Sequence, residues 1–226
     1  MPVAALMLLP ACDGLFEDFY DNAKSGEEAD STSVVERGGY GFIRTDSENH
    51  SGRIYVNAIS YTRWTYIDLH SLTVDSLDIG EETLTADSAL IGEPEHWDFA
   101  IHRYDLKTNG GAGMETELTS IDEARTLTSL PASEWVEDVW TTDRITIDMS
   151  HMMEGYLVYL PSYVNLEISK WLNLDLSTMP PIYTMSGRVY LLRMQDGTIA
   201  ALYLANYMNT KNVKGFMTID YIYPLF

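Results

Sequence analysis

The chain has 226 residues and a formal net charge of −20, because 34 Asp and Glu residues outnumber 14 Lys and Arg residues. Such a charge argues against a nucleic-acid-binding protein, since contacts with phosphates require clustered Lys and Arg. The single cysteine excludes an intramolecular disulfide and thiolate-rich zinc or iron–sulfur centres, while a 46% share of hydrophobic residues indicates a chain that builds a core.

The N-terminal segment predicts a secretion signal followed by a lipid anchor. Residues 1–11 are uncharged and apolar and lead directly into Cys12. They are too few to span a bilayer, which takes about 20 residues, but they suit the apolar part of a signal peptide that lacks its basic start. Leu9-Pro10-Ala11-Cys12 resembles a bacterial lipoprotein processing site. We therefore expect residues 1–12 to be a signal-peptide remnant with lipobox, ending in a lipidated Cys12. The alternative is a buried apolar strand with an incidental free cysteine.

Residues 13–36 predict an acidic, flexible tether. The segment holds eight carboxylates and one lysine, and Gly, Ser and Thr fill much of the remainder. Such a composition buries too little apolar surface to offset the entropy of ordering the chain. A lipidated cysteine, a tether and a body from residue 37 to residue 226 together describe an outer-membrane lipoprotein.

The sequence pattern of the body predicts strands almost throughout. Residues 53–59 and 64–69 predict an early pair of strands, and 144–149 alternate polar and apolar side chains as a half-buried strand does. Residues 188–193 and 199–204 predict a hairpin with a type I′ turn at Asp196-Gly197, and 215–223 predict a final strand. Short helices are expected near 120–125 and 162–172, and a glycine-rich loop at 108–114. We predict an all-β, mostly antiparallel domain.

The usual signatures of an enzyme are missing from the sequence. No two of the five histidines have zinc-site spacing, and His102 lies in an apolar stretch where a core histidine is expected. No Gly-x-Ser-x-Gly motif occurs, and nothing selects a catalytic pair among 34 carboxylates. We predict that the protein is not an enzyme, with a secreted hydrolase as a remote alternative.

Methionine is the anomalous residue type, with 11 in the chain. Met152 and Met153 follow His151 directly before a turn at Glu154-Gly155, and Met179 precedes Pro180-Pro181. Soft side chains on loop tips suit a ligand clamp, because a thioether binds soft metals and is a known axial ligand of haem. On spacing alone a second interpretation stays open, in which these methionines cap the core beneath their loops.

Several stretches together resemble one family. They are Tyr61-Thr62-Arg63-Trp64-Thr65-Tyr66-Ile67-Asp68-Leu69, the block from Trp97 to Asn109, Arg144-Ile145-Thr146-Ile147, Arg188-Val189-Tyr190 with Asp196-Gly197, and Lys214-Gly215 leading to Thr218–Pro224. In this order they resemble the HmuY-like haem-binding lipoproteins of anaerobic Gram-negative bacteria. The resemblance implies an all-β fold, likened to a right hand, whose loops hold the ligand.

The resemblance also implies a function. The protein would capture haem outside the cell, with host haemoproteins as a source, and pass it to a TonB-dependent outer-membrane receptor. It would sit at the surface of the outer membrane through its lipid anchor, with release from the cell as a further expectation. The alternative is a surface lipoprotein that binds a glycan or a protein through exposed aromatic residues.

The ligand residues follow from the same resemblance. The best-known members clamp the iron with one histidine from each of two loops, but no histidine lies between Trp171 and Arg188 here, and Leu176 stands at the expected spacing. Other members are understood to use methionines. This implies Met152 and Met179 as axial ligands, with Met153 and His151 as alternatives for the first.

The remaining expectations concern the rest of the ligand. Aromatic residues near the loops, Tyr156, Tyr159, Trp171 and Tyr183, would stack on the porphyrin. Lys107, Thr108 or loop amides would receive the propionates. Two thioether ligands should favour ferrous over ferric iron.

Overall fold

The computed structural model describes residues 40–46, 48–78, 93–175, 177–178 and 180–226. The predicted signal remnant with Cys12, the predicted tether and Met179 therefore lie outside the described residues. In the described part no helix is long and apolar enough to cross a membrane.

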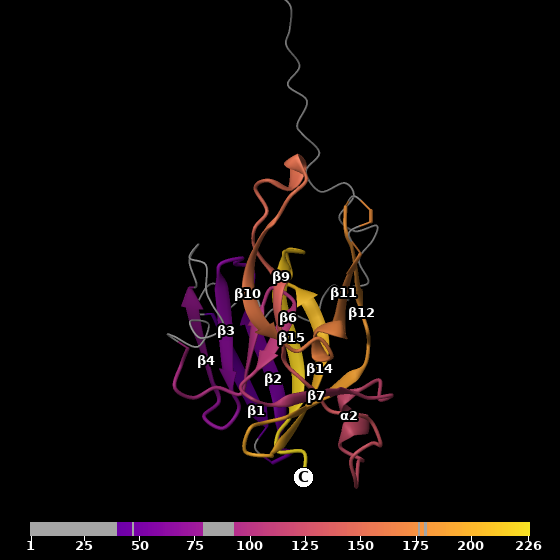
Figure 1. Cartoon of the computed structure of the whole chain (residues 1–226). Coiled ribbons are helices and arrows are strands. Elements are labelled where there is room, and N and C mark those ends of the chain that lie inside the picture. Colours follow the sequence, from indigo (N-terminus) through magenta and orange to yellow (C-terminus); the bar gives the residue numbers. More distant parts are fainter. Residues whose placement is uncertain (1–39, 47, 79–92, 176, 179) are drawn as a thin grey trace, which may run out of the picture.

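A large antiparallel sheet forms one layer of the body (Figure 1). Its seven strands lie in the order β1 (Gly41–Asp46), β2 (Ser51–Asn57), β15 (Lys214–Ile222), β14 (Ile199–Met208), β13 (Val189–Arg193), β7 (Ala112–Glu115) and β8 (Val136–Glu137). The only described α-helix, α2 (Ile121–Ala124), follows β7 in the chain.

A smaller sheet and two hairpins complete the domain. The small sheet has the order β4 (Thr73–Asp78), β3 (Arg63–Asp68), β5 (Phe99–His102) and β6 (Asp105–Thr108). One hairpin pairs β9 (Val139–Asp148) with β10 (Val158–Val164), and the other pairs β11 (Leu172–Asp175) with β12 (Ile182–Met185). Both hairpins rise from the same end of the body (Figure 1). Every described pairing is antiparallel, which confirms the predicted fold class.

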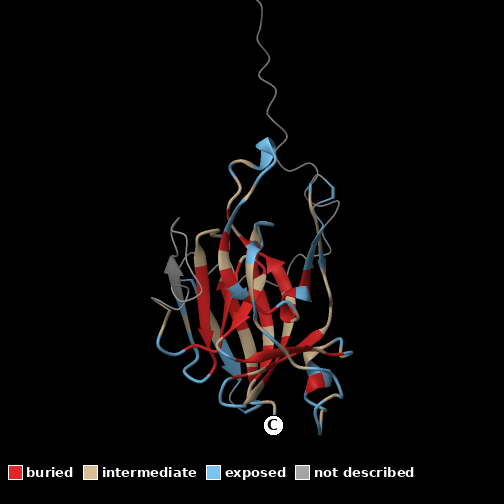
Figure 2. Ribbon diagram, in the orientation of Figure 1, coloured by how far each residue is buried: buried red, intermediate tan, exposed pale blue. Residues whose placement is uncertain are grey.

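The two sheets pack face to face around the main core. Successive side chains of a strand point to opposite faces, and the central strands are buried on both faces along most of their length (Figure 2). Tyr190 and Leu192 of β13 join the main core, which residues of both sheets build, whereas Val189 and Leu191 pack on the outer face with Ala124 of α2.

The β9–β10 hairpin covers the outer face of the small sheet with its lower part. Trp64 and Tyr66 of β3 point away from the main core and pack against Ile145 of β9 and Leu160 of β10. Because its lower part is anchored in this cluster, the hairpin is held to the body while its tip is exposed.

The structure corrects three local predictions. Residues 53–59 and 64–69 do contain strands, but β2 and β3 belong to different sheets. Of Asp196 and Gly197 only Gly197 has a positive φ (89°), and Met194 N donates to Thr198 O, so the turn is a three-residue loop with a left-handed glycine and not type I′. Residues 162–172 continue β10 and then form a short 3-10 helix, η4 (Ile168–Trp171).

Candidate functional site

The tip of the β9–β10 hairpin presents apolar side chains to solvent. It contains the 3-10 helix η3 (Met152–Glu154), which ends at Gly155. Gly155 lies in the left-handed region (φ 91°), and its N–H donates to Met152 O. Met152 is 37% exposed and Met153 86% exposed. Since folding leaves these side chains uncovered, the interpretation in which they cap the core fails for Met153 and accounts poorly for Met152.

His151 is held inside this tip. Its Nδ1 lies 3.1 Å from Oε2 of Glu154, and its ring stacks on Tyr156 with centroids 4.6 Å apart and planes 12° apart. The contacts orient the imidazole within the hairpin, so His151 acts in this conformation as a support for the turn that carries Met152 and Met153.

The second hairpin brings the other predicted loop to the same end of the body. Asp175 of β11 pairs with Ile182 of β12, so the segment carrying Met179 connects the two strands at their upper end. Tyr183 on β12 is half-buried, stacked on Tyr207 (5.6 Å, 14°) and edge-on to Tyr104 (5.3 Å, 74°). It therefore packs where the hairpin meets the body.

Three other residues expected at the ligand have structural roles instead. Trp171 is fully buried, and its Nε1 donates to Tyr104 O over 2.7 Å, so it cannot stack on a porphyrin between the hairpins. Lys107 is buried and bonded to Glu93 and Tyr66, and both the amide and the hydroxyl of Thr108 donate to Asp138. Neither residue is available to propionates between the hairpins.

His102 behaves as the sequence predicts. It is buried on β5, and its Nε2 donates to Tyr61 O over 2.7 Å. Burial lowers the pKa of His102 to about 4, so the ring is neutral at pH 7. It is a satisfied core histidine.

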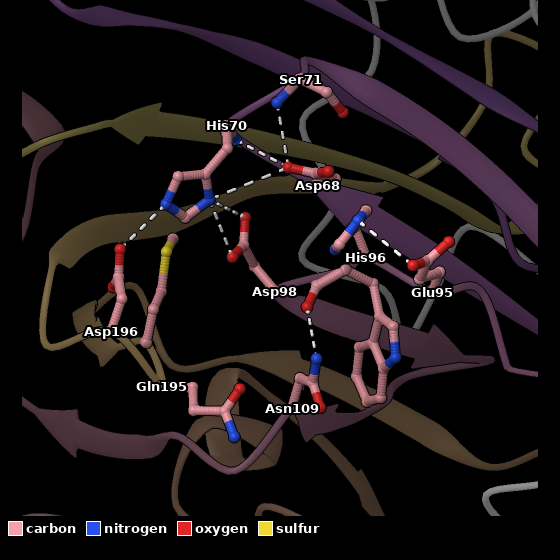
Figure 3. A pocket seen from close by; sticks show the side chains of 11 residues that line it. Asp68, His70, Ser71, Glu95, His96, Asp98, Asn109, Gln195 and Asp196 are labelled. Atoms are coloured by element: carbon pink, nitrogen blue, oxygen red, sulfur yellow. Dashed lines mark hydrogen bonds and ion pairs between the residues drawn. The ribbon is translucent and has the colours of Figure 1, made fainter.

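A cavity of about 500 Å³ lies at the opposite end of the body, near the C-terminus (Figures 1 and 3). His70 projects into it with a partner at each ring nitrogen. Nδ1 lies 3.1 Å from Oδ1 of Asp98, and Nε2 lies 3.1 Å from Oδ2 of Asp196 and 2.6 Å from the hydroxyl of Tyr223. The imidazole thus cross-links the small sheet, the β13–β14 turn and the C-terminal segment.

The charges around His70 favour its protonated form. Partial burial would lower the pKa of His70, but the hydrogen bond to Asp196 and the charge of Asp98 outweigh it and raise this pKa above 6.5. Burial raises the pKa of Asp98. Ligand atoms of Asp68, His70 and Asp98 lie within 4.8 Å of one another, a spacing that suits a cation, but hydrogen bonds and ion pairs within the protein already engage all three.

Comparisons with known proteins agree with this fold. The sequence profile of the HmuY protein family matches residues 60–221. The chain belongs to the HmuY family. A candidate HmuY-like haem-binding protein from Bacteroides vulgatus is 54% identical, with a TM-score of 0.73, over 81% of this chain and 97% of that one. No curated protein matches the chain significantly.

Two further solved structures share the fold of this HmuY-family protein. A candidate lipoprotein from Bacteroides fragilis is 51% identical over 82% of this chain and 95% of that one, with a TM-score of 0.75. An apo HmuY analogue from Tannerella forsythia is 24% identical over 76% of this chain and 94% of that one, with a TM-score of 0.63, and this likeness concerns the fold alone. The match to the family profile includes both hairpins.

Two basic residues of this HmuY-family protein become candidate functional residues only in the structure. Arg103 and Lys214 lie where the hairpins meet the body, close to Tyr104 and Tyr183. A sequence signal existed only for Lys214, which falls in a long stretch without carboxylates, whereas Arg103 lies two residues before Asp105. The two basic residues are far apart in the chain, and only the fold brings them together.

Proposed function

We propose that the protein binds haem between the two hairpins, with Met152 and Met179 as axial ligands. The observation that carries the proposal is the uncovered thioether tip of the β9–β10 hairpin, opposite a second hairpin whose connection contains Met179. Family membership supports it, since a relative at 54% identity is described as a candidate haem-binding protein. The role is one of binding, without catalysis.

Between Met152 and Met153 we favour Met152 as the first ligand. η3 begins at Met152, and the N–H of Gly155 bonds to its carbonyl, so the turn fixes its backbone. Met153 is almost fully exposed and remains the nearest alternative. His151 would first have to leave Glu154 and Tyr156.

Haem carries a large apolar face, and exposed apolar side chains of the β9–β10 hairpin would cover part of it. Tyr156, Val158 and Tyr159 are exposed by 51%, 37% and 36%. Burial of apolar surface contributes roughly 25 cal/mol per Å², so these side chains supply affinity while the thioethers supply specificity for iron.

The wider role follows from the same proposal. Loaded protein, held at the outer membrane through a lipidated Cys12 and its tether, would give haem to a TonB-dependent receptor. Haem taken from host haemoproteins is the expected source. Mass analysis of the protein isolated from bacterial membranes tests the anchor, since acylation of Cys12 would appear as added lipid mass, and an unmodified mature N-terminus would contradict it.

A haem titration tests the proposal. We expect a shifted Soret band with ferric haem and tighter binding after dithionite reduction, because neutral soft donors favour ferrous iron. Met152→Ala combined with Met179→Ala should weaken binding of reduced haem at least about tenfold, or 1.4 kcal/mol.

The matched control removes exposed apolar atoms from the same hairpins without removing a thioether. Val139→Ala with Leu174→Ala does so, since these side chains are 42% and 40% exposed. An unchanged reduced spectrum in the double methionine variant would overturn the ligand assignment. Absence of any Soret change in either redox state would overturn haem binding and favour the glycan or protein partner.

A further inference from the structure

Three connections form the end of the body from which the hairpins rise. They comprise residues 58–63, 103–104 and 209–215, which we call the palm. Ala58 N donates to Gly215 O over 2.8 Å, and Nη1 of Arg103 donates to Ile59 O over 2.5 Å, so the three connections contact one another.

The palm lies between the two hairpins. Tyr104 packs edge-on against Tyr183 of β12, while the neighbouring Asp105 forms an ion pair with Arg144 of β9 (2.8 Å). In Figure 1 the upper ends of β14 and β15 lie between the two hairpins. A ligand held by both hairpins would therefore face the palm with one edge.

The palm is cationic in a strongly acidic protein. It contains Arg63, Arg103, Lys211 and Lys214, four of the 14 basic residues of the chain, and none of the 34 acidic ones. Residues 57–67 and 197–219, which surround two of its connections, also have no Asp or Glu. An anion is repelled by most of this protein but not by the palm.

Arg103 is the central cation of the palm. Its guanidinium carbon lies 4.4 Å from the ring centroid of Tyr61 and 5.1 Å from that of Tyr104. Nη1 and Nη2 donate to backbone carbonyls and to the Tyr104 hydroxyl, and the buried Nε has no partner. Among the described residues no carboxylate forms an ion pair with Arg103, so its charge is not neutralised within that part of the protein.

Lys214 supplies a second cation on the same tyrosines. Its Nζ lies 4.2 Å from the ring centroid of Tyr183, which in turn contacts Tyr104. Arg103 and Lys214 thus flank two linked aromatic rings on the floor between the hairpins. Aromatic surface with a cation on each side suits a flat apolar molecule that carries two carboxylates on one edge.

We propose that the palm binds the two propionates of haem, with Arg103 and Lys214 as the residues that recognise them. The inference rests on the haem binding proposed above and adds an orientation, with the propionate edge toward the body and the iron toward the tips. Asp148 lies four residues beyond Arg144 in β9, about 13 Å at 3.3 Å per residue. A porphyrin radius, a propionate and a long cationic side chain together span a distance of this order.

The test compares haem with its dimethyl ester, in which both propionates are uncharged. We expect the full chain to bind haem about tenfold more tightly than the ester, the scale of a hydrogen bond to a charged group. Arg103→Gln and Lys214→Gln should each weaken haem binding several-fold and leave ester binding unchanged. Added salt should weaken haem binding more than ester binding.

Arg188→Gln is the matched control, because it removes one positive charge beside Glu117 and away from the palm. Arg103→Lys keeps the charge and should retain most of the preference for haem over the ester. It therefore distinguishes the effect of losing the positive charge from the effect of disrupting the fold. Equal affinities of the wild-type protein for haem and ester would overturn the palm assignment while haem binding stands. Equal weakening of haem and ester by both Gln variants would also overturn it. Failure of both ligands to bind would overturn the proposed function itself.

Discussion

The buried pair of Lys107 and Glu93 offers a quantitative test of how this fold is stabilised. Both side chains are more than nine-tenths buried, at 5% and 8% exposure. The ammonium of Lys107 bonds to Glu93 and to the Tyr66 hydroxyl, and it lies 4.7, 5.0 and 5.1 Å from the rings of Trp64, Tyr66 and Trp97. Burial lowers the pKa of Lys107 and outweighs the opposing effect of the charge of Glu93. The desolvation of the ammonium therefore costs more free energy than its interaction with Glu93 contributes.

We therefore expect Lys107→Met to be costly, because it leaves the carboxylate of Glu93 buried without its partner. Removing one member of a buried pair costs about 3–5 kcal/mol. With a urea dependence of about 2 kcal/mol per M, the unfolding midpoint should fall by about 1.5–2.5 M.

The double variant Lys107→Met with Glu93→Met should lie within about 1.5 kcal/mol of the wild type. Both desolvated charges are then gone, and thioethers pack well against aromatic rings. Glu93→Met alone should gain stability as pH rises from the lowered pKa of the folded Lys107 toward the ordinary lysine value of 10.5, because the buried ammonium loses its proton before the unfolded chain does.

Urea denaturation of the four proteins measures the coupling energy between the two sites. The surface pair Lys170 and Glu167 serves as the control, since its Nζ–Oε2 distance is 2.6 Å but Lys170 is 52% exposed. Lys170→Met should cost less than about 1 kcal/mol. Additive costs for Lys107→Met and Glu93→Met, or a Lys107→Met cost no larger than that of the control, would refute the reasoning.

Two further predictions concern His70 and Trp171. The pKa of His70 is raised by folding, so its stabilisation is complete below pH 6.5 and is lost as pH rises through the folded value; since the ring is 46% exposed, the loss should stay below about 1 kcal/mol. Thermal unfolding should show this decline, and His70→Gln should abolish it. The control His96→Gln changes an 81% exposed side chain and should retain the decline. A decline that persists in His70→Gln would contradict its assignment to His70. Trp171→Phe should cost about 2–4 kcal/mol in urea denaturation, because it leaves Tyr104 O without its buried donor and opens a cavity, and a cost below 1 kcal/mol would show that the bond is dispensable.

The sequence determined most of the strands, β9 most clearly because its polar and apolar side chains alternate. Residues 199–204 lie within β14, and the predicted ranges 144–149, 188–193 and 215–223 lie within β9, β13 and β15 except for one end residue each. His102 was identified as a core residue because it lies in an apolar stretch. The family resemblance, carried by separate short motifs, correctly indicated the all-β fold.

Only the tertiary structure decided which strands pair with one another and which side chains come together at each group of loops. Period-two alternation says which residues share a face but not which strand lies alongside, so β2 and β3 could be recognised as strands but not assigned to different sheets. Trp171 and Lys107 were expected at the ligand because they are large or charged. Their burial depends on Tyr104, Glu93 and aromatic residues far away in the chain.

Composition and local pattern thus indicated the fold class and the acidic charge, and the family resemblance added the two methionine-bearing loops as candidate ligand positions. Only the fold showed that these loops belong to hairpins rising from one end of the body, with Arg103 and Lys214 between them. The physical reason is that a site built from strand connections is a long-range property. The residues of such a site depend on which strand ends lie side by side, and the hydrogen-bonded order of strands in the sheets determines which ends these are.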